Sequence, residues 1–118
     1  MNNRVVIRSL VTSEGNLVAM DDGAIVWRPT LGTRVQIKLE AVATVLLAVK
    51  GPTGCYDMVA VGDSTGGISI LSLPRLDTID KFSIEGGIVR SINAVSDSSG
   101  KFLAAAQDGS VWVIGNQV

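Results

Sequence analysis

The alternation of apolar and polar residues recurs along this chain. In three segments an apolar strand leads into a turn that contains Asp and Gly, and a second alternating strand follows. These segments cover residues 17–27, 58–70 and 103–113. Their turn glycines, Gly23, Gly66 and Gly109, are separated by 43 residues in each case. A period in this range is typical of repeat architectures, and about four short strands per period predict the blades of a β-propeller.

The pattern predicts an all-β fold of eleven antiparallel strands in a single domain with three blade repeats. The repeats cover residues 4–40, 41–85 and 86–118. We expect strands at 5–11, 16–20, 24–28 and 34–39, then at 42–49, 56–61, 67–73 and 78–84, and finally at 88–95, 101–106 and 110–114. The third repeat therefore lacks a fourth, outermost strand. The turn at 63–66 is expected to be longer than its counterparts, with Ser64 and Thr65 inserted.

One segment, residues 39–50, has a second interpretation. It is rich in Ala and Leu and could form a helix, which would make the protein an α+β domain. However, β-branched residues occupy alternate positions, and the segment stands where the first strand of each other repeat stands. We therefore predict a strand.

Two tryptophans have positions that the repeat defines. Trp27 shares its position with Ile70 and Val113, which predicts a core residue. Trp112 shares its position with Val26 and Ser69, on the opposite face of the sheet. Because this second position varies in character, Trp112 is a candidate binding residue as well as a packing residue.

Composition narrows the class of protein. The 118 residues are 47% hydrophobic and 18% charged, which argues against disorder and allows one domain with a modest core. Apolar residues at this level fit either a β core rich in Val and Ile or a surface that another subunit covers. The net charge of −1 provides no basic field, so we expect no nucleic-acid partner.

Residue types also limit the chemistry. There is no histidine, the commonest general base and metal ligand, so we expect no enzyme activity, catalytic residues, metal or cofactor. Cys55 is the only cysteine, which rules out a disulfide within the chain and fits a reducing compartment. The sequence shows no signal peptide and no run of 18 apolar residues. We therefore expect a cytoplasmic protein without membrane contact.

The repeats resemble those of the WD40-type β-propeller family. The resemblance rests on residues 18–27 and 104–113, where small apolar residues precede Asp-Gly and alternating apolar residues follow. The middle repeat matches more loosely. The family's Gly-His and Trp-Asp pairs are missing, so the chain resembles a degenerate, three-bladed half of a propeller, and the family's network residues do not transfer.

Three blades do not close a ring, and the two end blades would each leave an apolar face open. A soluble monomer rarely exposes patches of this size. Two chains placed head to tail would give six blades, so we expect a homodimer with blade-to-blade contacts. The main alternative is that the chain is a fragment of a longer propeller.

Charged residues mark candidate binding surfaces on the expected propeller. The turns and connections on one face gather acidic residues, namely Asp21, Asp22, Glu40, Asp63, Glu85 and Asp108. Asp is a common turn former, which alone explains most of these residues, and the functional interpretation is a rim that binds a cationic peptide or a divalent ion. Arg8 and Arg90 occupy matching places in the innermost strands, where they would either hold an anion in the channel or pair with the acidic turns.

These observations favour a non-catalytic binding or scaffold module that uses a face or the channel of a propeller, with a protein or peptide as ligand. This inference rests on architecture. A carbohydrate-binding, lectin-like propeller is the alternative, but aromatic residues do not recur from repeat to repeat. A small α+β enzyme or regulatory domain fits the sequence least.

Overall fold

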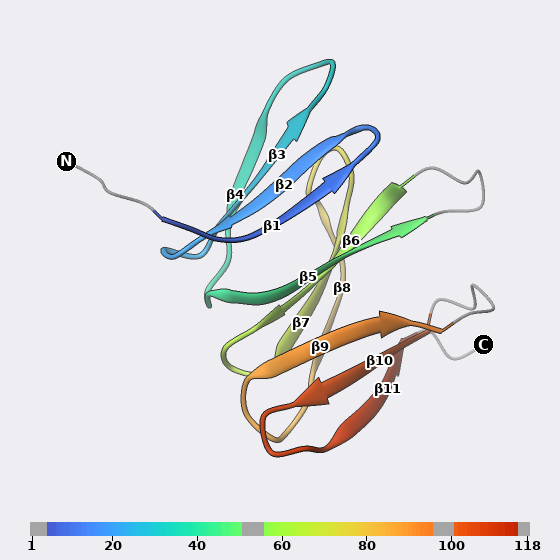
Figure 1. The fold of residues 1–118 in the computed structure, drawn as a ribbon. Coiled ribbons are helices and arrows are strands. Elements are labelled where there is room, and N and C mark those ends of the chain that lie inside the picture. The colour runs from blue at the N-terminus through green and yellow to red at the C-terminus, as the bar shows by residue number, and fades with distance from the viewer. Residues whose placement is uncertain (1–4, 51–55, 96–100, 116–118) are drawn as a thin grey trace.

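The computed structural model describes residues 5–50, 56–95 and 101–115, which form eleven strands in three antiparallel sheets (Figure 1). The first sheet contains β1 (Val6–Thr12), β2 (Gly15–Met20), β3 (Ala24–Pro29) and β4 (Val35–Lys38). The second contains β5 (Ala43–Lys50), β6 (Tyr56–Asp63), β7 (Gly67–Ser72) and β8 (Thr78–Ser83). The third contains β9 (Val89–Ala94), β10 (Lys101–Ala106) and β11 (Val111–Gly115).

The structure confirms the all-β prediction, and each of the eleven predicted strands has its counterpart. The helix considered for residues 39–50 does not form, because this segment supplies strand β5. Among the described residues there is no helix with the length and hydropathy needed to cross a membrane. Cys55 lies outside the described residues.

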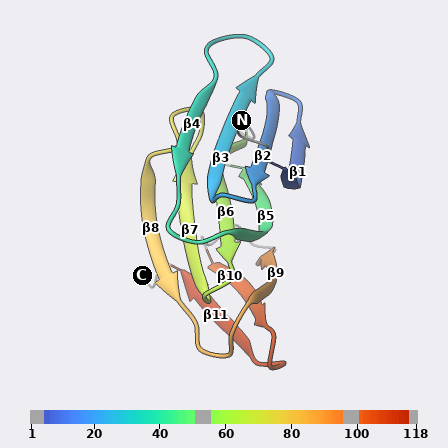
Figure 2. The same ribbon diagram turned by 90° about the vertical axis from the view of Figure 1, so that its left-hand side faces the viewer.

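Within each sheet the strands follow one another in chain order, as in a propeller blade. We therefore call the sheets blades 1, 2 and 3. Their first strands, β1, β5 and β9, contact one another in sequence and form the inner edge of the stack. Figures 1 and 2 show the three blades fanning outward from this edge.

The turns between the second and third strands are alike in all three blades. In each turn the glycine amide donates to the carbonyl three residues earlier, at 3.0–3.4 Å. Gly23, Gly66 and Gly109 all have a φ of +91°, a conformation that favours glycine. The expected insertion in the middle turn is therefore wrong. Ser64 and Thr65 correspond to Asp21 and Asp22 in blade 1 and to Gln107 and Asp108 in blade 3.

A β-bulge interrupts the inner strand of each blade at the same place. The extra residue is Ile7 in β1, Thr44 in β5 and Arg90 in β9, as the shifts in pairing register show. A bulge bends its strand and increases the local twist. Arg90 therefore matches Ile7 and Thr44, and the expectation that it occupies the same place as Arg8 is wrong by one residue.

Two apolar layers hold the blades together. Between blades 1 and 2, Ile25 and Trp27 pack with residues that include Val59 and Leu71. Trp27 is buried, as its position in the repeat predicted. Burial of such side chains contributes about 1.5–3 kcal/mol each.

The second layer lies between blades 2 and 3. There Ile68 and Ile70 of β7 pack with side chains of blade 3 that include Ile92 and Phe102. Each layer is thus made by the third-strand residues of one blade and the facing side of the next.

Candidate functional site

Blade 3 presents an exposed apolar face on the side away from blade 2. Leu103 pairs across the strands with Val113, Val111 lies two residues before Val113 on the same side of β11, and the two valines are 65% and 66% exposed. Val111 and Val113 occupy the repeat positions of Ile25 and Trp27, which are buried against the next blade. Blade 3 thus displays the same apolar row that its neighbours use for blade-to-blade contact. We call these three residues the blade 3 face.

The outer side of blade 1 differs from the expectation. Four apolar residues on this side form a separate cluster and are at most 9% exposed, namely Val18, Met20, Ala24 and Val26. The side is apolar, as predicted, but the prediction that it is exposed is wrong. Of the two blade faces expected to be open, only the blade 3 face exposes its apolar row among the described residues.

The candidate carboxylates Asp22, Asp63 and Asp108 lie at the three equivalent turns and do not form one cluster. Each accepts a hydrogen bond of 2.8–3.0 Å from the amide that follows the turn glycine. Asp22 and Asp108 each immediately precede the turn glycine. Asp63 stands three residues before the turn glycine Gly66, and its carboxylate still accepts from the Gly67 amide. These bonds give the carboxylates a structural role in the turns.

Trp112 and Asp108 are the two candidates that the structure brings together. The Trp112 Nε1–H donates to Ser110 Oγ at 2.9 Å, and the Ser110 hydroxyl donates to Asp108 Oδ1 at 2.7 Å. The side-chain and backbone hydrogen bonds from Ser110 lower the pKa of Asp108 below its usual value of 3.8. Trp112 lies on the side of β11 that faces blade 2, paired with Ala104 and partly exposed.

Arg8 and Arg90 are both exposed. The Arg8 guanidinium donates from Nε to the Thr44 carbonyl oxygen at 2.8 Å and from Nη1 to the carbonyl oxygen of Ile7. It thereby links the inner strands of blades 1 and 2, and its described partners are carbonyls where the sequence suggested a carboxylate. The Thr44 hydroxyl in turn donates to the Val89 carbonyl oxygen at 2.5 Å, which links blades 2 and 3.

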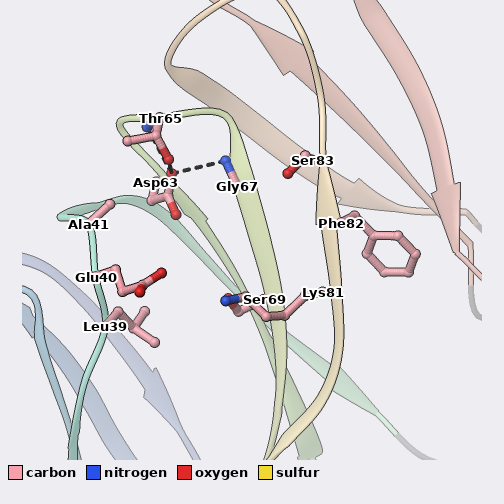
Figure 3. A pocket seen from close by; sticks show the side chains of 10 residues that line it. All are labelled: Leu39, Glu40, Ala41, Asp63, Thr65, Gly67, Ser69, Lys81, Phe82 and Ser83. Carbon is pink, nitrogen blue, oxygen red and sulfur yellow. Dashed lines mark hydrogen bonds between the residues drawn. The ribbon is translucent and has the colours of Figure 1, made fainter.

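Sequence reasoning missed a cavity of about 340 Å³ beside blade 2 (Figure 3). It lies between the β4–β5 connection and strands β7 and β8. Ten residues line it: Leu39, Glu40, Ala41, Asp63, Thr65, Gly67, Ser69, Lys81, Phe82 and Ser83. The available signal was Ser69, a small polar residue at a position where the other repeats have Val26 and Trp112.

A metal site is not formed by the described residues, because no group of three or more acidic or cysteine side chains among them could hold an ion. The rim carboxylates are too dispersed over separate turns to act together.

No family model and no curated protein matches the sequence. Among solved structures, the fold is similar to a chain in the crystal structure of BBS1N in complex with ARL6DN, soaked with mercury, with a TM-score of 0.74 and 11% identity. The match covers 95% of this chain and 34% of that chain, so this chain spans about a third of its length. At this identity the comparison shows the fold alone, an all-β arrangement similar to a β-propeller structure.

Proposed function

We propose that this chain is a non-catalytic protein-binding module of degenerate WD40-like blades, and that the blade 3 face is where another blade docks. The observation that carries this proposal is the exposed row of Leu103, Val111 and Val113. The same repeat positions in blades 1 and 2 are buried against a neighbouring blade. A sheet face with this pattern is already shaped to receive the facing side of a blade.

The occupant that we propose is a second copy of the chain. Placed head to tail, two copies give a closed ring of six blades with two equivalent interfaces. Blade 3 of each copy then meets the outer side of blade 1 of the other, where Val18 and Val26 supply apolar contacts. Because these side chains are at most 9% exposed in the isolated chain, docking has to uncover them.

A protein-binding role also agrees with the structural comparison. The similar chain, BBS1N, was crystallised in complex with ARL6DN. Its partner says nothing of the identity of a partner here, but it supports the use of such a fold for protein contact.

A charge on the blade 3 face tests the proposal. Val113→Lys places a cation at the centre of the row. The matched control is Leu31→Lys, because Leu31 lies in the β3–β4 connection and is 90% exposed. Sedimentation equilibrium should show that Val113→Lys weakens self-association about tenfold or more, because a buried apolar contact becomes a desolvated charge. Equal association of both variants would refute docking through this face.

A further inference from the structure

Ser69 lines the cavity beside blade 2 with a small side chain. This residue points toward blade 1, on the same side of the sheet as its cross-strand partner Val61. At the equivalent position between blades 2 and 3, the large indole of Trp112 is present. The small serine side chain therefore fills less of the first junction than the tryptophan side chain, itself 36% exposed, fills of the second.

The hydroxyl of Ser69 has no partner among the described residues, although the residue is only 5% exposed. Ser69 Oγ is not one of the enclosed polar atoms without a partner, which among the described residues are Trp27 Nε1 and Asp57 Oδ1, so the hydroxyl is open to the cavity. Because Ser69 lines the cavity, a bound molecule in that cavity would be within reach of its hydroxyl.

Opposite charges border the same cavity without neutralising each other. Asp63 and Glu40 stand on one side, and Lys81 of β8 stands on the other. Within the part of the chain that the structure describes, neither Glu40 nor Lys81 has a side-chain ion pair or hydrogen bond. Figure 3 shows the Lys81 side chain running across β7 to end beside Ser69, while the Glu40 carboxylate points into the space from the far side.

The turn fixes the orientation of one of these carboxylates. Asp63 Oδ1 accepts hydrogen bonds from the Gly67 amide at 2.9 Å and from the Thr65 amide and hydroxyl at 2.8 and 2.7 Å. The second oxygen, Oδ2, makes none of these bonds and is available for a ligand. A rigid carboxylate of this kind is a preorganised acceptor for an ammonium group.

This combination selects a class of ligand. A divalent ion would need more oxygen ligands than converge here, and a phosphate would need more than one cation. An ammonium group held by Asp63 and Glu40 and a carboxylate held by Lys81 and Ser69 would satisfy all four polar groups. Both sets of charged groups border one cavity of about 340 Å³. A single small molecule that carries both charges can therefore contact all of them.

We propose that this cavity binds a free α-amino acid or a similar small zwitterion. Its ammonium group lies between Asp63 and Glu40, and its carboxylate accepts hydrogen bonds from the Lys81 ammonium and the Ser69 hydroxyl. The site lies within one chain and is independent of the docking proposed for the blade 3 face.

Nuclear magnetic resonance titration of the ¹⁵N-labelled protein tests this site with glycine, L-serine and L-leucine as zwitterionic probes. Acetate and methylamine, at the same millimolar concentrations, present each charge alone. We expect at least one amino acid to shift the amide signals of Gly67, Ser69 and Lys81 with saturation, and the single-charge probes to cause no saturable shift. Absence of saturable shifts with all three amino acids overturns the proposal, and so does saturation by acetate or methylamine alone.

Two variants identify the groups that bind. Glu40→Gln and Lys81→Gln each remove one charge and should weaken binding about tenfold, as expected for the loss of one charge-assisted interaction. The matched controls are Glu85→Gln, which alters the repeat equivalent of Glu40 at the next junction, and Lys38→Gln, which alters an exposed lysine on β4. Unchanged affinity in Glu40→Gln or Lys81→Gln, or equal weakening in the controls, would contradict the proposed placement of the ligand.

Discussion

The substitution Ser69→Val should make the protein more stable. Ser69 is 5% exposed, and its hydroxyl opens into the cavity without a partner among the described residues. Its replacement therefore breaks no hydrogen bond within the part of the chain that the structure describes. Valine also adds apolar volume next to an existing cavity, at about 0.8 kcal/mol for each buried methylene equivalent, and it favours strands.

The cavity that Ser69 lines supplies the space for valine, and Val26 at the same repeat position of blade 1 shows that the strand accepts this residue. We therefore expect the free energy of unfolding to rise by about 1 kcal/mol, with most of the gain from the added apolar burial. Urea denaturation followed by tryptophan fluorescence measures this change as a higher midpoint with an unchanged slope.

Ser69→Ala is the matched control, since it removes the hydroxyl without filling the space, and it should give a smaller gain. A Ser69→Val protein that is less stable than the wild type would refute the reasoning, because it would mean that the hydroxyl has a partner or that the cavity cannot accept a larger side chain.

Three further predictions concern the turns and the blade contacts. In thermal unfolding, Gly66→Ala should destabilise the protein more than Gly109→Ala. Both glycines have a φ of +91°, so the backbone strain of the substitution is the same. However, a Cβ on Gly66 would lie 2.5 Å from the Ile84 carbonyl oxygen, whereas a Cβ on Gly109 would meet nothing within 4 Å. Equal losses would show that the close approach between turn and connection is absent. Gly62→Ala should lower the unfolding temperature by several degrees, because its Cβ would lie 2.5 Å from Val89 Cγ1 across the junction of blades 2 and 3; an unchanged temperature would contradict this packing. The Asp108 carboxyl should titrate below 3.8 in an NMR pH titration. Since its pKa is lowered in the folded state, its contribution to stability is present above the unfolded value and is lost as pH falls through the folded value, and Ser110→Ala should raise the pKa toward 3.8.

Much of this fold follows from the sequence because β-sheets translate alternation directly into faces. The equal spacing of Gly23, Gly66 and Gly109 identifies three turns that need the same backbone conformation. The shared position of Trp27 and Ile70 correctly assigns both to the core. The order of strands then follows, since short connections join neighbouring strands.

The remaining features depend on information that a single strand does not carry. The bulges at Ile7, Thr44 and Arg90 arise from pairing register between strands, so the alignment of Arg8 with Arg90 by sequence alone was off by one residue. The cavity depends on how the β4–β5 connection passes strands β7 and β8. The charges around it, Glu40 and Lys81, come from separate connections and strands that only the folded chain brings together.

The solution mass of the wild-type chain, measured by light scattering across a dilution series, tests most directly the central claim that the blade 3 face docks onto a second copy. We predict a mass near twice 12.3 kDa that persists on dilution into the micromolar range. A folded species with a constant mass near 12.3 kDa over the same range would contradict the claim.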